Sequence, residues 1–75
     1  MKNNNNFKLL DVVALLKNIH SRKLIKGQVG TIVEVLDKDV YEVEFSNRKG
    51  ETLLTTPVHS KDIILLHYEL AEMSH

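Results

Sequence analysis

The chain of 75 residues contains ten Lys or Arg, ten Asp or Glu and no Cys, so its formal net charge is zero. This length fits one small domain, and the absence of cysteine excludes disulfides, a thiolate nucleophile and a thiolate zinc site. Nucleic-acid-binding domains usually carry a basic excess, so the balanced charge argues against that class. A charge near zero also favours a bound protein partner or a homo-oligomer.

The N-terminal residues MKNNNN offer nothing to bury, so we expect a disordered tail over residues 1–6. The tail lacks the apolar segment of a signal peptide, and apolar runs such as Ile63–Leu66 are far too short to cross a bilayer. A small domain without disulfides also suits a reducing compartment. We therefore expect a cytoplasmic protein with no membrane contact.

The segment Phe7–Ile19 fits two patterns. Leu9, Val12, Val13 and Leu16 approximate a helical stripe, whereas alternate residues from Leu10 to Leu16 also fit one face of a strand. The adjacent β-branched residues Val12 and Val13 favour a strand. We expect a strand over Asp11–Leu16, with a short helix as the alternative.

Basic residues gather in and just before the next segment, His20–Lys26. One interpretation is a solvated loop, and the other is a basic lip that contacts an acidic partner or a phosphate backbone. We expect Leu24 and Ile25 to lie on the edge of the core within this loop. The four residues of the basic lip are Lys17, Arg22, Lys23 and Lys26.

A β-hairpin is the strongest local pattern in the chain. Two alternating, β-branched runs, Val29–Leu36 and Val40–Phe45, are joined by the polar residues Asp37-Lys38-Asp39. Gly27 and Gly30 precede the hairpin without the following Lys-Ser or Lys-Thr of a phosphate-binding loop. We expect these glycines to mark a bulge or a sharp bend.

Reflecting the two strands about Lys38 pairs Val35 with Tyr41, Glu34 with Glu42 and Val33 with Val43. Since side chains alternate between faces, the predicted inner face carries Val33, Val35, Tyr41, Val43 and Phe45. The outer face then carries the acidic residues Glu34, Glu42 and Glu44, extended around the turn by Asp37 and Asp39. Like charges on directly opposed residues are unfavourable, so we interpret this acidic stripe as a candidate partner-binding surface.

The remaining segments predict two more strands. Ser46–Gly50 is a turn, Glu51–Thr56 is a strand that Pro57 ends, and Val58–Asp62 is a turn with Ser60 as its opening cap. Ile63–Tyr68 is the closing strand, and residues 70–75 form a polar tail. The sequence thus predicts an all-β domain over residues 7–69, a small five-stranded SH3-like barrel.

Two resemblances accompany this fold. KGQVGTIVEVL resembles the strand entrance of the translation-associated KOW motif. More of the chain is similar to the bacterial domain of unknown function 4926 family, through FKLLDVVALL, KGQVGTIVEVL, VYEVEFSN and IILLHYE. This second resemblance implies a compact SH3-like barrel that acts with a protein partner, for instance in an antitoxin or immunity role. The family defines no functional residues.

No catalytic or metal-binding pattern stands out. His59 with Asp62 is the one close His–carboxylate pair, and Ser60 beside His59 is not a triad, which needs base, nucleophile and orienting group in reach of each other. We therefore expect no enzyme, no cofactor and no metal. A carboxylate pair among Glu34, Glu42 and Glu44 would need a deep sugar-binding cleft to act as a glycosidase.

Three hypotheses for function remain. The first is a protein-interaction module, an accessory or antitoxin-type subunit, whose acidic stripe binds a basic partner. The second is a KOW-like domain that binds RNA or a ribosome-associated protein through the basic lip. The third is that the acidic stripe only solvates the barrel, with Lys49 or Lys61 neutralising it.

Overall fold

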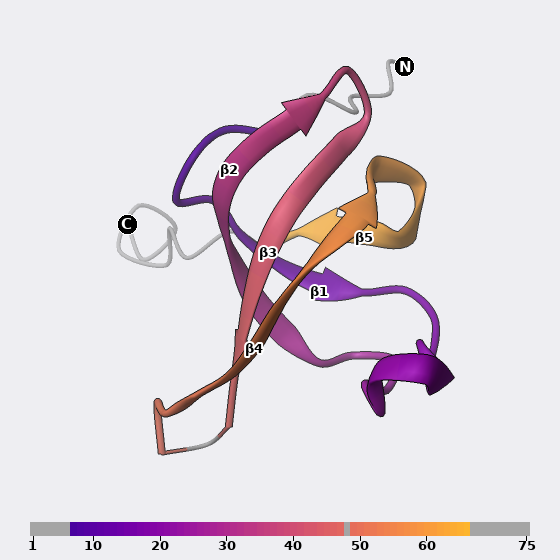
Figure 1. The fold of residues 1–75 in the computed structure, drawn as a ribbon, viewed down its shortest axis with the longest axis vertical. Helices are drawn as coiled ribbons and strands as arrows, with labels where there is room; N and C mark the ends of the chain where they lie inside the picture. The colour runs from indigo at the N-terminus through magenta and orange to yellow at the C-terminus, as the bar shows by residue number, and fades with distance from the viewer. Residues whose placement is uncertain (1–6, 48, 67–75) are drawn as a thin grey trace, which may run out of the picture.

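The computed structural model describes residues 7–47 and 49–66, and this part of the chain is all-β (Figure 1). Its strands are β1 (Val12–Leu15), β2 (Val29–Asp37), β3 (Val40–Ser46), β4 (Thr52–His59) and β5 (Ile63–Leu65). They form one antiparallel sheet of order β4-β3-β2-β1-β5, which confirms the predicted all-β, five-stranded fold. Two 3₁₀ turns, η1 (His20–Arg22) and η2 (Ser60–Asp62), precede β2 and β5 respectively.

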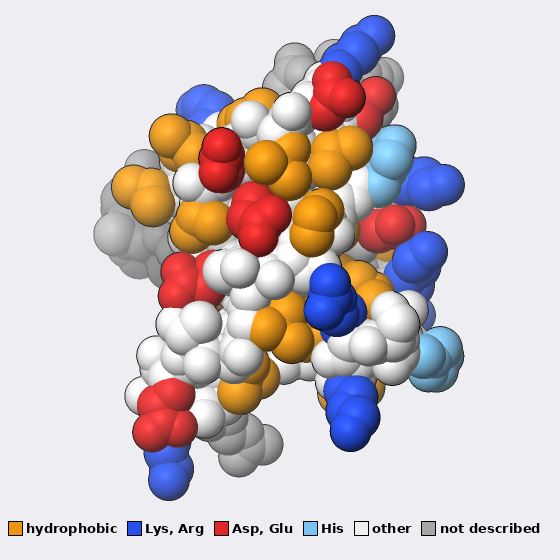
Figure 2. All heavy atoms as spheres, viewed as in Figure 1, with side chains coloured by type: hydrophobic (Ala, Val, Ile, Leu, Met, Phe, Trp, Pro, Cys, Tyr) orange, Lys and Arg blue, Asp and Glu red, His pale blue; other side chains and the backbone are white. Residues whose placement is uncertain are grey.

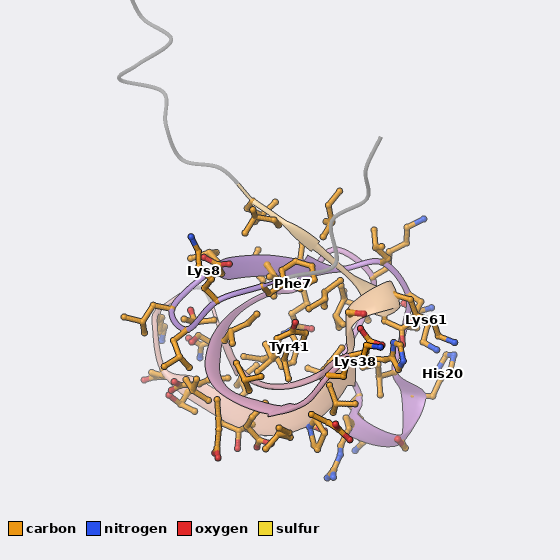
Figure 3. All side chains as sticks on the ribbon, turned by 90° about the horizontal axis from the view of Figure 1, so that it is seen from above. Phe7, Lys8, His20, Lys38, Tyr41 and Lys61 are labelled. Carbon is orange, nitrogen blue, oxygen red and sulfur yellow. The ribbon has the colours of Figure 1, made fainter. Side chains whose placement is uncertain are left out.

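The sheet is strongly curved, and its two edge strands are β4 and β5. Seen from above, β2 and β3 bend around the side chains that they enclose (Figure 3). Among the described residues β4 pairs only with β3, and β5 pairs only with β1. The barrel that the sequence predicts is therefore not closed by hydrogen bonds.

Several expectations concern residues outside the described part of the chain. These are the tails predicted for residues 1–6 and 70–75 and the end of the closing strand at Tyr68. Within residues 7–47 and 49–66, no helix is long and apolar enough to span a membrane.

The ambiguous N-terminal segment forms strand β1, close to the predicted span of Asp11–Leu16. β1 lies between β2 and β5 and pairs with both. Val13 and Leu15 are fully buried, whereas Val12 and Ala14 between them are half-buried, so the segment has the period of two that distinguishes a strand from a helix. Because β1 pairs with a strand on each side, the segment is the expected strand and not the alternative short helix.

The β2–β3 hairpin has two irregularities that change the predicted register. A two-residue turn, Lys38-Asp39, pairs Asp37 with Val40, and register shifts at Leu36 and Val33 follow. The predicted pairs Val35–Tyr41 and Glu34–Glu42 are correct, whereas Val43 pairs with Ile32 instead of Val33. The bulges therefore lie inside β2 and not at Gly27 or Gly30. Of the bulge or sharp bend expected at these glycines, the bend is present at Gly27, whose φ is +90°.

This register corrects the predicted inner face of β2. Ile32 is fully buried and Val33 is 38% exposed, because the extra residue at Val33 moves Ile32 to the position opposite Val43. Val35 keeps its predicted position opposite the buried Tyr41, but it is 50% exposed. On β3 the predicted inner residues Tyr41, Val43 and Phe45 are all buried, as expected from regular alternation. The remaining core residues are Val13, Leu15, Leu24, Val58 and Ile63.

Gly30 lies where two parts of the core approach each other closely. It pairs with Phe45 on β3 and with Val13 on β1. A Cβ at this position would lie 2.6 Å from Val43 Cγ1 and 2.8 Å from Phe45 Cδ1. Only glycine leaves room for Phe45 to pack across β2. Gly27 has a different reason, because its φ of +90° belongs to a sharp turn in open space.

Strand β4 corrects the prediction that pairing ends at Pro57. The strand continues through Pro57 to His59, with Pro57 opposite Glu42. Because β4 is an edge strand, the missing amide of Pro57 faces away from β3 and costs no ladder hydrogen bond. Ser60 was predicted to open the next turn. The cap of η2 is instead His59, whose Nδ1 accepts a hydrogen bond from the Lys61 backbone N–H.

The long loop between β1 and β2 is anchored by one apolar residue. Leu24 is 2% exposed and forms a bridge with Ile19, whereas the neighbouring Ile25 is 64% exposed. The expectation that both residues lie on the core edge is thus correct for Leu24 and wrong for Ile25. Phe7 packs edge-on against Tyr41, with ring centroids 5.4 Å apart. Figure 3 labels both residues.

Candidate functional site

The outer side of β2, β3 and β4 carries the three glutamates of the predicted stripe, and we call it the acidic face. On β3, Glu42 and Glu44 alternate with the buried residues Tyr41, Val43 and Phe45, so they point away from the core. Glu34 on β2 lies opposite Glu42 and points to the same side. Figure 2 shows acidic side chains in a row along this side of the molecule, with apolar side chains beside them.

The pairing of Glu34 with Glu42 is the central feature of the acidic face. The two residues are direct cross-strand partners, and Pro57 lies on the other side of Glu42. Opposed side chains in an antiparallel sheet have Cβ atoms about 5 Å apart, and like charges at that position are destabilising. Neither carboxylate has a hydrogen-bond or ion-pair partner among the described residues. The bulge at Leu36 brings the two together, since it restores the register after the short turn.

Glu44 lies in the next row of the same face. It is flanked by Thr31 on β2 and Thr55 on β4, and its Oε2 accepts a hydrogen bond from the Thr52 hydroxyl. Glu44 is half-buried, as is Glu42. One carboxylate oxygen of Glu44 is thus engaged within the sheet, while the side chain still contributes its charge to the acidic face.

The two aspartates of the predicted stripe have structural roles in the turn. Asp37 Oδ1 accepts a hydrogen bond from the Lys38 backbone N–H at 2.7 Å. The backbone oxygen of Asp39 accepts one from the Ser60 N–H at 2.8 Å, which ties the turn to η2. Asp37 and Asp39 therefore lie at the tip of the hairpin, beyond the Glu34–Glu42 pair.

No strand of the sheet contains Lys or Arg. Every Lys and Arg within residues 7–47 and 49–66 lies in a turn, loop or terminal segment, whereas β2 and β3 together contain Glu34, Asp37, Glu42 and Glu44. The ion pair within the described residues joins Lys17 Nζ to Asp62 Oδ2 at 3.5 Å, remote in sequence from the acidic face. Neither Lys49 nor Lys61 forms an ion pair with the three glutamates, so the expected neutralisation by these lysines is not present in residues 7–47 and 49–66.

The four residues of the basic lip are distributed over the loop between β1 and β2. Lys17 is committed to Asp62, Arg22 ends η1, and Lys23 follows it in a left-handed conformation with φ of 59°. Lys26 lies at the far end of the loop, where its backbone N–H donates to Asn18 Oδ1 at 2.8 Å. Arg22, Lys23 and Lys26 are exposed.

The residues considered for catalysis or metal binding have other partners. His59 caps η2 through Nδ1, Asp62 pairs with Lys17, and Ser60 is 3% exposed. In the part of the chain that the structure describes, no group of three or more His, Asp or Glu side chains is placed to hold a metal ion.

Sequence reasoning missed the exposure of two apolar residues next to Glu34 in β2. Val33, Val35 and Leu36 are exposed on the bulged half of β2, although the alternation pattern predicts Val33 and Val35 to be buried. Beside them Leu10 is exposed, and its backbone N–H donates to the Ile32 oxygen at 2.7 Å. The bulges are the cause, and a bulge has no composition that the sequence pattern reveals.

Comparison with known proteins places this fold in a family. A family model, the domain of unknown function DUF4926, matches residues 9–65. The match covers well over half of the chain, so the protein belongs to this family, which confirms the resemblance seen in the sequence. No curated protein and no solved structure matches the chain.

Proposed function

We propose that this member of the DUF4926 family is a non-enzymatic binding protein that docks the basic surface of a protein partner on its acidic face. In this proposal the protein serves as an accessory subunit or as an antitoxin-type or immunity-type inhibitor of the partner. The partner supplies the positive charge that the strands of this chain do not contain. The resemblance to KOW domains stays a prediction without a counterpart in the comparisons.

The opposed pair Glu34–Glu42 is the observation that carries the proposal. A cross-strand pair of like charges reduces the stability of an isolated sheet, and a Lys at either position would remove that cost. A basic side chain of a partner placed between the two carboxylates converts the repulsion into two attractive contacts. The pair is thus unfavourable in the free protein and favourable in a complex.

The surroundings of the pair suit a protein interface. Charged residues mainly steer association and select the partner, whereas buried apolar contacts hold the complex together. Pro57 lies beside Glu42, and the exposed residues Val33 and Leu36 are close in sequence to Glu34. Figure 2 shows this mixture of acidic and apolar side chains on one side of the molecule.

Affinity purification of the tagged protein from its own host tests the proposal. We expect the wild-type protein to retain a protein with a basic surface, and Glu34→Gln/Glu42→Gln to reduce its recovery roughly tenfold, as loss of close charge pairs does. Asp11→Asn/Glu51→Gln is the matched control, because it removes two exposed or half-exposed charges elsewhere and keeps the acceptor oxygens that bond Lys8 and Asn47. Equal losses from the two double variants, or a partner with an acidic contact surface, would contradict the proposal.

RNA binding through the basic lip remains the alternative. Lys17 is engaged by Asp62, which leaves Arg22, Lys23 and Lys26 for phosphate contacts. This function predicts binding to a labelled single-stranded RNA at low salt, with affinity that falls steeply as salt rises. Fluorescence anisotropy measures it, and the charge reversals Arg22→Glu and Lys23→Glu would abolish it while leaving the acidic face intact.

A further inference from the structure

A groove of about 650 Å³ opens at the end of the sheet opposite the Lys38-Asp39 turn. The last residues of β3 and the first residues of β4 form one side of it, and the loop that leads into β2 forms the other. Figure 2 shows apolar side chains in this lower part of the molecule, below the row of acidic ones. The groove is separate from the apolar core.

Three exposed apolar side chains line the groove. Ile25, Val29 and Leu53 are 64%, 43% and 49% exposed, and they come from the loop, from β2 and from β4. The hydrophobic effect favours covering such side chains by a partner in proportion to the apolar area removed from water. Their position around one hollow distinguishes them from singly scattered surface residues, which need no explanation.

The loop side of the groove is held in place by hydrogen bonds. Lys26 N–H donates to Asn18 Oδ1 at 2.8 Å, Gly27 N–H to the Leu15 oxygen at 2.8 Å, and Ile25 N–H to Gln28 Oε1 at 3.2 Å. These bonds tie the loop to β1 and close it on itself. The loop is therefore ordered before any partner binds, which lowers the entropic cost of binding.

The opposite side is ordered by Asn47. Its Oδ1 accepts hydrogen bonds from the backbone N–H groups of Lys49 at 2.8 Å and Glu51 at 3.0 Å, and its Nδ2 donates to Glu51 Oε1. The Asn47 backbone adds two further bonds, from its N–H to the Glu51 oxygen and from the Gly50 N–H to its own oxygen, both at 3.0 Å, so Asn47 holds the turn that precedes Leu53. Both sides of the groove are preformed.

The groove continues the acidic face along the same strands. On β3, Ser46 lines the groove and lies on the same side as Glu44 and Glu42, two and four residues earlier. At about 3.3 Å per residue, the groove begins about 13 Å from the Glu34–Glu42 pair. An extended segment of about five residues covers both.

The sign of the charge changes from the acidic face to the groove. One end carries Glu34, Glu42 and Glu44, and the charged residue that lines the groove is Lys26. A segment with basic residues at the first end is attracted there and repelled at the second. Charge complementarity therefore selects a segment that is basic at one end and apolar, without further positive charge, at the other.

We infer that the groove receives an apolar anchor side chain from the same basic partner that the acidic face binds, an inference that rests on the proposed function. The partner segment is extended. Its basic residues lie over Glu42 and Glu34, and its apolar anchor follows about four residues further along, between Ile25, Val29 and Leu53. Lys26 sets the direction of the segment, since a positive residue at the anchor end is disfavoured.

Synthetic peptides test this arrangement on the intact protein by NMR titration. The first peptide carries two lysines and, about four residues further along, one leucine in an otherwise Thr-rich sequence, and the second has serine in place of leucine. We expect both to shift the amide signals of Glu34, Glu42 and their strand neighbours. Only the leucine peptide shifts those of Ile25, Val29 and Leu53, and it binds about fivefold or more tightly than the serine peptide.

Three serine variants locate the anchor. Leu53→Ser and Ile25→Ser each remove a groove side chain, and Ile64→Ser, the control, removes an apolar side chain on β5 whose exposure matches that of Leu53, 50% against 49%. We expect the affinity advantage of the leucine peptide to disappear in Leu53→Ser and in Ile25→Ser, and to persist in Ile64→Ser. None of the three side chains belongs to the buried core, and thermal unfolding verifies that the fold is retained.

The outcomes separate this inference from the proposed function. Equal affinity of the two peptides, or an advantage that survives Leu53→Ser and Ile25→Ser, overturns the anchor while leaving binding at the acidic face intact. Absence of any shift on β2 and β3 with both peptides at low salt overturns the proposed function itself.

A third peptide, with a lysine beyond the leucine, tests the direction in which the segment binds. It should bind more weakly than the first, and Lys26→Gln should remove that difference.

Discussion

The two faces of β3 differ in whether contacts within the chain explain which residues they carry. Towards the inside, Tyr41, Val43 and Phe45 are buried in a core to which each of the other four strands and the loop before β2 contribute residues. Towards the outside, Glu42 and Glu44 lie among threonine, proline and a third acidic residue, Glu34, with no Lys or Arg in the strands of the sheet. The inner face is thus accounted for by the fold alone, whereas the outer face is not.

Truncation on the inner face gives the largest expected effect. Phe45 is fully buried, and Phe45→Ala should lower the free energy of unfolding by about 3–5 kcal/mol through lost burial and the cavity that remains. Urea denaturation followed by circular dichroism measures this change. Glu44→Gln, one residue away on the outer face, keeps the acceptor for Thr52 and should change stability little. A similar loss in both variants would remove the distinction between the faces.

A second change tests how tightly the inner face is packed. Gly30→Ala places a methyl carbon 2.6 to 2.9 Å from atoms of Val43, Phe45 and the Glu44 backbone oxygen, closer than van der Waals contact allows. We therefore expect the free energy of unfolding to fall by about 1–3 kcal/mol. Gly27→Ala meets no atom within 4 Å and should lose only about 1–2 kcal/mol, from its positive φ. Adding Val43→Ala to each variant separates the two causes. This second substitution should be less costly beside Gly30→Ala than beside Gly27→Ala.

On the outer face the expected sign is reversed. Glu42→Lys places a positive charge opposite Glu34, and we expect the free energy of unfolding to rise by about 0.2–1 kcal/mol. The gain should shrink in high salt, because screening weakens exposed charge pairs. Denaturation at low and high salt measures it. Loss of stability in Glu42→Lys would mean that the glutamate has a structural role and would weaken the proposed function.

The smallest effect is expected at the ion pair between Lys17 and Asp62. Lys17 is largely exposed and its Nζ lies 3.5 Å from Asp62 Oδ2, so Lys17→Met should lower the free energy of unfolding by only about 0.5 kcal/mol. Thermal unfolding at low salt reveals such a difference most clearly. A loss above about 1 kcal/mol would show that this ion pair stabilises the fold more than exposed ion pairs usually do.

The sequence predicted the hairpin well where the period of two is uninterrupted. On β3 the alternation of VYEVEFS correctly assigns Tyr41, Val43 and Phe45 to the core. On β2 a symmetric reflection about Lys38 is correct only for Val35–Tyr41 and Glu34–Glu42. The two-residue turn shifts the register by one position, the bulge at Leu36 compensates for it, and the bulge at Val33 shifts it again.

These bulges follow from tertiary curvature and not from local preference. The sheet must bend so that β1 and β5 cover its apolar face, and a bulged strand bends where an extra residue is accommodated. Nothing in Val33 or Leu36 distinguishes them from the regular strand residues around them. For the same reason the groove at Val29 and Leu53 was not predicted, because it depends on where two distant turns meet. The three glutamates were identified from alternation alone, and their role stays a proposal.

Pro57 has a consequence for the behaviour of the protein at high concentration. β4 is an eight-residue strand at the edge of the sheet, the kind of edge to which a strand of another molecule adds during fibril growth. A proline in its second half offers no amide to an incoming strand and interrupts a continuous ladder. Pro57 thus hinders a second molecule from adding a strand along β4. At high concentration, fibril growth through this edge is therefore disfavoured.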